Sequence, residues 1–309
     1  MPYKTVSPTV SLLLICGTLL IAPASAQHFQ QINGTFVSVA AGANQVFAID
    51  NFFKVWRFNA TKQSFDKIKG AKLGQIAVGG GSLFQPDEVW GQANGEVYHY
   101  NYATKTFDEI PGVLLSSITV GLGNHTLDNC HAYEVWGLTS SQQAFRYDYC
   151  ADAFTQIPGA SPTQISTGGG DVWAIDSNGD VYSYAFGAQK FVQVPGAGAG
   201  TLSQITVGIN DVWGFGFGGI QEYTVYRYDP NSFAWISYGA GGGVGDQVVA
   251  GGDGVWVIDA PDSVYHMDSL GYATGFEQVP GALTSIAVGS GAGVWGINSS
   301  HQLFVFVRP

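Results

Sequence analysis

Short apolar runs separated by turn residues follow one another along the chain. The clearest example is the segment 163–196, which contains TQIST, DVWAID, DVYSYA and KFVQVPG at 163–167, 171–176, 180–185 and 190–196. These runs are rich in Val, Ile, Tyr, Phe and Trp, and Gly, Asn, Asp or Pro lies between them, which is typical of strands and turns. Asn178-Gly179 favours a tight hairpin between the second and third runs. The pattern predicts four antiparallel strands.

The same four-run unit occurs seven times. Each copy has a Val-aromatic pair in its second run, at Val46-Phe47, Val89-Trp90, Val135-Trp136, Val172-Trp173, Val212-Trp213, Val255-Trp256 and Val294-Trp295. The pairs are 43, 46, 37, 40, 43 and 39 residues apart, a period that marks a repeat architecture. Four antiparallel strands at this period predict an all-β fold, a single seven-bladed β-propeller of four-stranded blades.

The two ends of the chain complete one unit. The last unit has runs at 285–289, 293–298 and 302–307 but lacks a fourth, whereas FQQING at 29–34 matches the missing run. We therefore expect the N-terminal strand to complete the C-terminal blade and to close the ring. Residues 27–309 are predicted to form one domain.

Residues 1–26 have the pattern of a signal peptide. Lys4 precedes the apolar run SLLLICGTLLIA at 11–22, and Ala24-Ser25-Ala26 offers a cleavage site after two small residues. The apolar run is too short to span a bilayer, so we expect no membrane insertion. The sequence predicts a secreted protein that begins at Gln27.

Composition narrows the class of partner. The net charge is −11, only 11% of residues are charged, and the chain contains 43 Gly and 14% aromatic residues. The aromatic content excludes a disordered chain, and the negative charge argues against a nucleic-acid partner. After removal of the signal peptide two cysteines remain, Cys130 and Cys150. Both fall in turns on the same rim of the predicted propeller, so we expect them to form a disulfide.

The repeated motifs resemble those of the tectonin β-propeller lectins, which include the tachylectin-1 and fish-egg lectin types. The motifs are I-x-V-G-x-x-x-V-W-G-I-N/D, G-x-V-Y-x-Y and F-x-x-I-P-G, best shown at 205–214, 225–229, 293–298 and 107–112. The resemblance implies carbohydrate binding on cell or microbial surfaces, often multivalent, with roles in recognition or innate defence. Tectonin propellers are often six-bladed, whereas this sequence predicts seven blades.

Residues for catalysis or metal binding do not form a familiar motif. The six histidines after the signal peptide, at 28, 99, 125, 131, 266 and 301, lack metal-site spacing, and neither G-x-S-x-G nor a Walker loop occurs. The acidic segment 176–180 is interpreted as a hairpin turn and not as a calcium loop. We expect no metal, no cofactor and no enzymatic activity, and an enzyme with its site in the central channel stays an alternative.

The aromatic residues divide into two groups. Six of the eight tryptophans share the repeated second-run position, often beside a small residue, which favours packing between blades. Trp56 and Trp235 break this register and are candidates for exposed ligand contacts. Four N-x-S/T sequons, at Asn33, Asn59, Asn124 and Asn298, are candidate glycosylation sites if the source is eukaryotic.

A repeated polar position in the third run is the main candidate for ligand binding. It carries Arg57, His99, Arg146, Arg227 and His266, with Ser183 and Val305 in the other two units. A guanidinium can hydrogen-bond vicinal hydroxyls or anionic sugar groups and stack on an aromatic ring. The alternative is a salt bridge to a turn carboxylate of the next blade. The sequence thus predicts a secreted lectin with several sites and glycans as partners; a protein-interaction or structural propeller is the competing interpretation.

Overall fold

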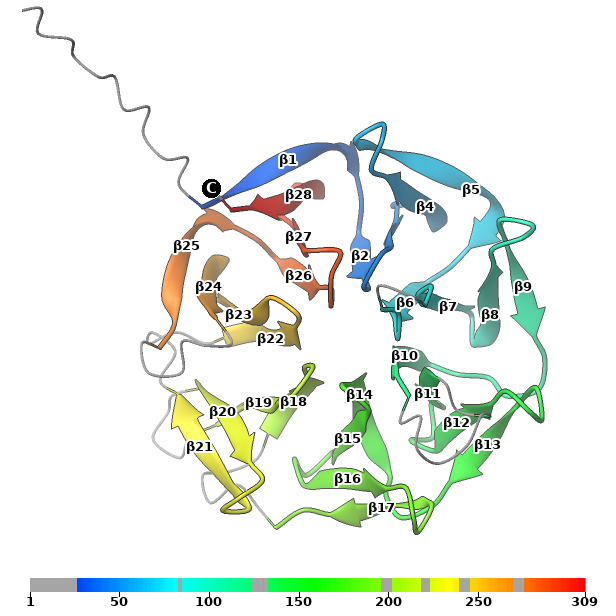
Figure 1. Ribbon diagram of the computed structural model, residues 1–309, viewed down its shortest axis with the longest axis vertical. Helices are drawn as coiled ribbons and strands as arrows, with labels where there is room; N and C mark the ends of the chain where they lie inside the picture. Colours follow the sequence, from blue (N-terminus) through cyan, green and yellow to red (C-terminus); the bar gives the residue numbers. More distant parts are fainter. Residues whose placement is uncertain are drawn as a thin grey trace, which may run out of the picture.

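The protein is a ring of β-sheets. The computed structural model describes residues 27–82, 85–123, 130, 133–195, 202–217, 223–238, 245–268 and 275–308. Their regular elements are strands β1–β28, grouped in seven four-stranded antiparallel sheets that surround a central channel (Figure 1). No helix in these ranges is long and apolar enough to cross a bilayer. The predicted all-β, seven-bladed propeller is confirmed.

Each blade runs from an inner strand at the channel to an outer strand at the rim. Blades 1 to 4 contain β2 (Ser38–Ala41), β3 (Val46–Ile49), β4 (Lys54–Asn59) and β5 (Ser64–Lys72); β6 (Gln75–Gly79), β7 (Glu88–Ala93), β8 (Glu96–Asn101) and β9 (Thr106–Ile110); β10 (Ser117–Leu122), β11 (Tyr133–Leu138), β12 (Ala144–Asp148) and β13 (Ala153–Ile157); and β14 (Pro162–Gly168), β15 (Asp171–Asp176), β16 (Val181–Ala185) and β17 (Lys190–Gln193). Blades 5 to 7 contain β18 (Leu202–Val207), β19 (Val212–Phe217), β20 (Tyr223–Asp229) and β21 (Ala234–Tyr238); β22 (Gly245–Gly251), β23 (Gly254–Asp259), β24 (Ser263–Met267) and β25 (Glu277–Ala282); and β26 (Ser285–Val288), β27 (Val294–Ile297), β28 (Gln302–Val307) and β1 (His28–Thr35).

Blade 7 closes the ring with strands from both ends of the chain. Its outer strand is β1, which pairs antiparallel with β28 from His28 opposite Val307 to Ile32 opposite Leu303 (Figure 1). The ring of Phe29 lies 5.8 Å from Trp256 of blade 6, measured between centroids, so β1 also packs on the neighbouring blade. The predicted closure by the N-terminal strand agrees with this sheet order.

The repeated tryptophans form the core between blades. Trp90, Trp136, Trp213 and Trp256 are 0% exposed, and Trp173 and Trp295 are also buried. Each faces the next blade: Trp90, for example, packs on Val135 and on Tyr147, whose ring centroid lies 4.7 Å away. Burial of one such side chain stabilises the fold by about 1.5–3 kcal/mol. The packing interpretation of these six residues is confirmed.

The glycine after the tryptophan has a different neighbour from the one we expected. The sequence pattern predicts that a small residue at this point allows adjacent blades to approach each other. A Cβ atom on Gly137 would lie 2.3 Å from Cδ1 of Leu115, and Leu115 belongs to the segment that leads into the inner strand of the same blade. The same close contact with a leucine occurs in three other blades, for the pairs Gly91–Leu73, Gly214–Leu202 and Gly296–Leu283. The glycine therefore makes room for a leucine within its own blade.

The inner strands are tied to one another around the channel. The amide of Gln75 in blade 2 accepts a hydrogen bond from the backbone N–H of Ile118 in blade 3 at 3.0 Å and donates to its carbonyl at 3.2 Å. Gln164, Gln204 and Gln247 accept equivalent bonds from the next blade. These bonds satisfy backbone groups that a sheet edge would otherwise leave unpaired.

Candidate binding site

The five candidate Arg and His side chains stand directly across from the core position of their blades. The cross-strand pairs are Phe47–Arg57, Trp90–His99, Trp136–Arg146, Trp213–Arg227 and Trp256–His266. Ser183 and Val305 occupy the same position opposite Trp173 and Trp295. Each candidate lies in its own blade, so the structure does not bring the five together in one site.

In blade 3 the arginine is held inside the blade. Arg146 donates from Nε to Oε2 of Glu134 at 2.9 Å and from Nη2 to Oε1 at 2.6 Å. The guanidinium carbon also lies 5.8 Å from the ring centroid of Trp136 and 5.5 Å from that of Tyr184 in blade 4. Arg146 is 9% exposed and Glu134 is 0% exposed. The ion pair therefore lies within one blade, and not between a cation and the next blade as the alternative interpretation expected.

Blade 2 repeats the arrangement with histidine. His99 stacks on Trp90 with ring centroids 4.4 Å apart, and its Nε2 lies 2.8 Å from Oε2 of Glu88. The same oxygen accepts hydrogen bonds from Nε1 of Trp90 at 2.9 Å and from the hydroxyl of Tyr149 in blade 3 at 3.0 Å. Burial alone would raise the pKa of Glu88, but these hydrogen bonds and the charge of His99 lower it below its ordinary value.

The remaining candidates have different partners. His266 stacks on Trp256 at 4.3 Å and donates from Nε2 to the backbone carbonyl of Asp253 at 2.7 Å. Arg227 stands across from Trp213 in blade 5. Arg57 donates from Nε to Oε1 of Gln45 at 2.7 Å, which leaves its two terminal nitrogens without an ion pair to any described residue.

The sequence contains a signal for the glutamate partners of His99 and Arg146. Glu88 and Glu134 each stand two residues before the tryptophan, as E-V-W. Because side chains two apart in a strand share a face, the carboxylate, the tryptophan and the opposite cation meet on one side of the sheet. The spacing therefore predicts an intra-blade pair where an acid precedes the aromatic residue by two and an Arg or His stands opposite that aromatic residue.

A groove between blades 1 and 2 lies beside Arg57. Its volume is about 620 Å³. Arg57 and Asn59 come from β4, and the hairpin between β8 and β9 lies opposite. The hydrogen-bonding side chains of its lining include Asn44, Gln45, Asn59, Tyr100, Thr104 and Thr106. Arg57 is the one member of the repeated third-strand set that lines this groove.

Trp56 and Trp235 are half-buried and outside the groove. Trp56 donates from Nε1 to Oδ2 of Asp50 at 3.0 Å and lies edge-on to Phe36, with centroids 6.2 Å apart. Trp235 lies 6.2 Å from Trp173 and packs on the core between blades 4 and 5. Both positions are more exposed than the six core tryptophans, and a role in ligand contact stays a prediction.

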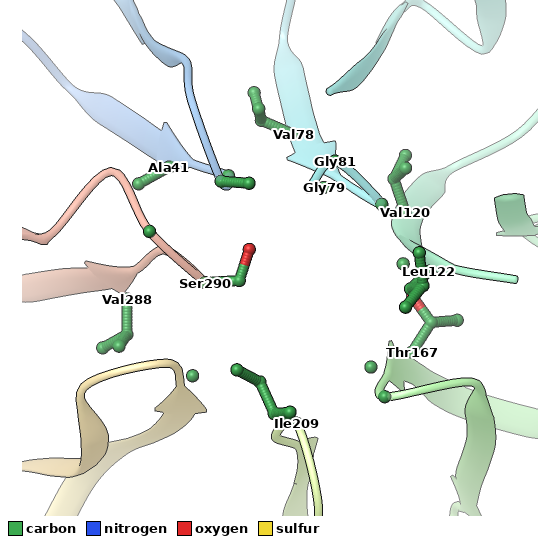
Figure 2. Close-up of a pocket in the computed structure, with 18 of the residues that line it drawn as sticks. Ala41, Val78, Gly79, Gly81, Val120, Leu122, Thr167, Ile209, Val288 and Ser290 are labelled. Carbon is green, nitrogen blue, oxygen red and sulfur yellow. The ribbon is translucent and has the colours of Figure 1, made fainter. Parts of the chain in front are cut away.

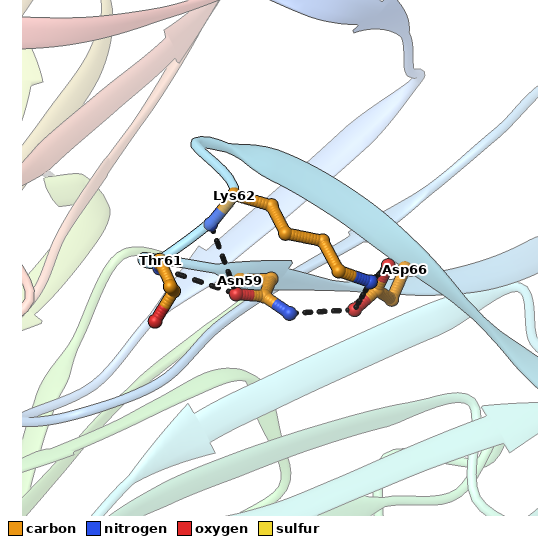
Figure 3. Close-up of polar contacts among 4 residues, drawn as sticks. All are labelled: Asn59, Thr61, Lys62 and Asp66. Atoms are coloured by element: carbon orange, nitrogen blue, oxygen red, sulfur yellow. Dashed lines mark hydrogen bonds and ion pairs between the residues drawn. The ribbon is translucent and has the colours of Figure 1, made fainter.

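The sequon asparagines occupy different settings. Asn59 accepts hydrogen bonds from the backbone N–H of Thr61 and Lys62 and donates from Nδ2 to Asp66 at 2.7 Å (Figure 3). The amide of Asn298 is engaged in the same way, with a donated bond to Gln302 at 2.9 Å. Asn33 is exposed at an irregularity of β1, and Asn124 lies outside the described residues. Glycosylation of these residues stays a prediction.

The turn chemistry expected at 176–180 is present. Oδ1 of Asp176 accepts hydrogen bonds from the backbone N–H of Asn178 at 2.8 Å and of Asp180 at 3.0 Å, and Oδ2 accepts from the hydroxyl of Tyr182. Gly179 has a φ of 77°, which only glycine adopts without strain. These hydrogen bonds give Asp176 a structural role in the hairpin turn.

The central channel has two unlike ends. One mouth, of about 330 Å³, is lined by small and apolar residues of the inner strands and of the turns that follow them, such as Gly79, Val120, Ile209 and Ser290 (Figure 2). The other end is lined by Gln, Ser and Thr side chains that include Gln75 and Gln164. Among the described residues that line either end, none is titratable.

The predicted disulfide is present in blade 3. Cys130 and Cys150 are bonded, with their Cα atoms 5.1 Å apart, and the backbone N–H of Tyr149 donates to the carbonyl of Cys130 at 3.1 Å. The bond joins the turn before β11 to the hairpin between β12 and β13. The rim assignment from the strand order was therefore correct.

The fold makes this protein a seven-bladed β-propeller, and comparison of its sequence with protein families places it in one of them. The Tectonin domain family matches residues 20–185 and 161–308, and the chain belongs to this family. No curated protein matches the chain. Two solved structures share the fold: YCF48 bound to D1 peptide, with 13% identity, a TM-score of 0.64 and coverage of 92% of this chain and 97% of that one; and human WBSCR16, with 11% identity, a TM-score of 0.63 and coverage of 91% and 89%.

Proposed function

We propose that this protein is a secreted, non-enzymatic lectin that binds glycans of cell or microbial surfaces. Membership of the Tectonin family suggests the class of activity, because the tectonin lectins it resembles bind carbohydrate. The observation that carries the proposal is the groove beside Arg57, whose lining combines a guanidinium with amide and hydroxyl groups. Its volume lies within the range of about 300–1,000 Å³ that small-ligand sites occupy.

Arg57 is held ready to contact a ligand. Its Nε is fixed by Gln45 at 2.7 Å, and its guanidinium carbon lies 5.9 Å from the ring centroid of Tyr102. The terminal nitrogens can then donate two parallel hydrogen bonds to neighbouring oxygens of a sugar. Because the side chain is already oriented, binding loses little rotamer entropy.

The number of sites follows from the partners of the repeated cations. The sequence pattern predicted up to five similar sites. In blades 2 and 3 the candidate side chain is paired with a glutamate of its own blade, and His266 of blade 6 is bonded to a backbone carbonyl. The partner of Arg57 is the neutral amide of Gln45, so the charge of Arg57 is not balanced by a carboxylate in this contact. We therefore propose the groove between blades 1 and 2 as the principal site. Avidity for a glycan-dense surface would come from further, weaker sites or from several copies of the protein.

A glycan array followed by calorimetry tests the proposal. We expect binding to at least one glycan or bacterial polysaccharide, and a stoichiometry of one strong site per chain. Arg57→Gln should weaken that site about tenfold, since two charge-assisted hydrogen bonds are lost. Lys190→Gln, an exposed change in blade 4, is the matched control. No binding to any glycan would overturn the proposal and favour a protein-interaction propeller; five equal sites would favour the repeated-position hypothesis.

Secretion is tested separately. We expect the protein to be exported when the full chain is expressed in a cell that secretes proteins, with an N-terminus at Gln27. N-terminal sequencing of the exported protein measures this. A cell-retained protein with an intact N-terminus would contradict it.

A further inference from the structure

Positive charge is concentrated in blade 1. The segment 54–72 contains six of the twelve Lys and Arg residues of the chain and a single acidic residue, Asp66. The basic residues are Lys54, Arg57, Lys62, Lys67, Lys69 and Lys72. The whole protein has a net charge of −11, so this segment opposes the charge of the rest of the molecule. Such separation creates a local positive potential on an acidic protein.

Comparison of the repeats with one another shows where the basic residues differ from the scaffold. The outer strand of blade 1 reads FDKIKG at 65–70, where other units read FDEIPG, FTQIPG, FVQVPG and FEQVPG. Lys67 and Lys69 thus replace acidic or amide residues and proline, and none of the other six units carries a basic residue at either position. The propeller fold itself therefore does not require these two lysines.

These lysines line the groove beside Arg57. Lys67 and Lys69 belong to β5, and Lys105 reaches the groove from the hairpin between β8 and β9. All three are exposed, and none forms an ion pair with a described residue. Asp66 is the one carboxylate among the described lining residues, and it is already bonded to Lys62 at 2.9 Å and to Asn59 (Figure 3).

One residue of the groove lining, Tyr100, has a buried hydroxyl. Tyr100 lines the groove, is 1% exposed, and its hydroxyl has no hydrogen-bond partner in the part of the chain that the structure describes. An unpaired buried hydroxyl is costly and rare in folded proteins. A ligand oxygen at this place would accept its hydrogen bond and remove the cost. This observation is independent of the charge and points to an acceptor-rich ligand.

We propose that the groove between blades 1 and 2 binds an acidic saccharide, a sugar that carries carboxylate or sulfate groups. The proposal rests on the lectin function proposed above and adds the chemical class of its ligand. Arg57, Lys67, Lys69 and Lys105 supply charge to the acidic groups, while Thr104 and Tyr100 supply hydroxyl groups for the sugar oxygens. A long polyanion would also pass over acidic surface, whereas a short acidic sugar contacts the groove alone.

Trigalacturonate and its fully methyl-esterified form are the matched probes, because esterification removes the carboxylate charges and leaves the sugar hydroxyls, ring oxygens and linkages unchanged. Calorimetry with the full protein should show binding of the free acid and at least about tenfold weaker binding of the ester. Added salt should weaken binding of the acid more than that of the ester. A heparin-derived hexasaccharide serves as the sulfated probe and should compete for the same site.

Two variants locate the site. Lys67→Gln/Lys69→Gln should weaken acid binding about tenfold, while Lys72→Gln/Lys190→Gln removes the same charge outside the groove and should change affinity less than about threefold. Tyr100→Phe should weaken binding and leave thermal stability equal or higher, because the hydroxyl it removes has no hydrogen-bond partner among the described residues.

The outcomes separate this inference from the lectin proposal. Equal weakening by both double variants would overturn the groove as the site, as would unchanged affinity in Tyr100→Phe together with Lys67→Gln/Lys69→Gln. Binding of the ester as tightly as the acid would overturn the charge selectivity and leave the lectin proposal standing. Binding of single-stranded DNA or of vesicles with anionic lipid as tightly as the acid sugar would overturn the choice of a saccharide. Absence of binding to any saccharide would overturn both proposals.

Discussion

Arg146 and Glu134 form a two-bond ion pair inside blade 3, with N–O distances of 2.9 and 2.6 Å. Glu134 also accepts a hydrogen bond from Nε1 of Trp136 at 2.7 Å. The carboxylate thus joins the cation of the third strand to the tryptophan of the second. Arg146, which the sequence pattern marks as a ligand candidate, is therefore a buried side chain that bonds to its own blade.

Removal of one partner of this pair should be strongly destabilising. Arg146→Ala leaves the Glu134 carboxylate buried and unpaired, and we expect a loss of about 3–5 kcal/mol in the free energy of unfolding. The double variant Arg146→Met/Glu134→Leu should lose less than the sum of the single changes. Urea denaturation measures these values. A loss below about 1 kcal/mol in Arg146→Ala, combined with lost glycan affinity, would show that Arg146 serves binding instead.

Glu88 makes part of the stability dependent on pH. Its folded-state pKa is lowered, so at acidic pH the unfolded chain binds more protons than the folded one and stability rises with pH. The contribution of Glu88 is fully present above the unfolded pKa of about 4.3 and is lost as the pH falls through the lower folded pKa. Glu88→Gln should therefore be less stable at pH 7 and show a shallower decline towards acid. Glu109→Gln, an exposed change in β9, should keep the wild-type slope in urea denaturation at several pH values.

The architecture could be derived from the sequence, whereas the partners of polar residues could not. Seven Val-aromatic pairs at a regular period define the blades, and the motif FQQING at 29–34 defines the closure. These features are local and repeat, so each copy supports the others. The rim position of Cys130 and Cys150 followed from strand order alone.

The groove residues could not be found from the features that the seven repeats share, because they are residues in which one repeat differs from the others. Arg146 and His99 share the repeated third-strand position with Arg57, but the E-V-W sequence of their blades places a glutamate beside each of them. The groove residues Lys67 and Lys69 stand out only as departures from the repeat. Side-chain packing between blades decides whether an Arg or His at the repeated position has a partner or faces a groove. The spacing of residues along the sequence does not determine this packing.

Asp87 holds the first two blades together. The carboxylate is 0% exposed and accepts hydrogen bonds from the backbone N–H of Ala43, Asn44 and Gln45 in blade 1, at 2.7, 2.7 and 2.8 Å. Asp87→Ala leaves three donors unpaired and should lower the free energy of unfolding by about 3 kcal/mol or more. Asp66→Asn removes an exposed ion pair and should cost less than about 1 kcal/mol in the same urea titration. Equal losses would show that the buried bonds contribute no more than the surface pair.

The hairpin of blade 1 contains a residue that its backbone does not favour. Phe53 has a φ of 64° and is 58% exposed, at the turn position where blade 4 has Gly179. A left-handed conformation costs a residue other than glycine roughly 1–2 kcal/mol. Phe53→Gly should therefore raise the free energy of unfolding by about 1 kcal/mol, and the matched change Gly179→Ala should lower it. Thermal denaturation of both variants measures the sign; a destabilised Phe53→Gly would show that the aromatic ring makes a contact that outweighs the backbone cost.

The glycine after the tryptophan should be replaceable only if its leucine neighbour is reduced. Gly137→Ala places a Cβ atom 2.3 Å from Cδ1 of Leu115, which is buried and cannot move freely. Overpacking of this kind costs about 1–3 kcal/mol. In Gly137→Ala/Leu115→Ala the clash is removed, so the double variant should be more stable than the sum of the two single losses predicts. A double-mutant cycle in urea measures this coupling. Additive losses would show that the glycine is not required by Leu115 of its own blade. They would favour the interpretation that it allows the neighbouring blade to approach.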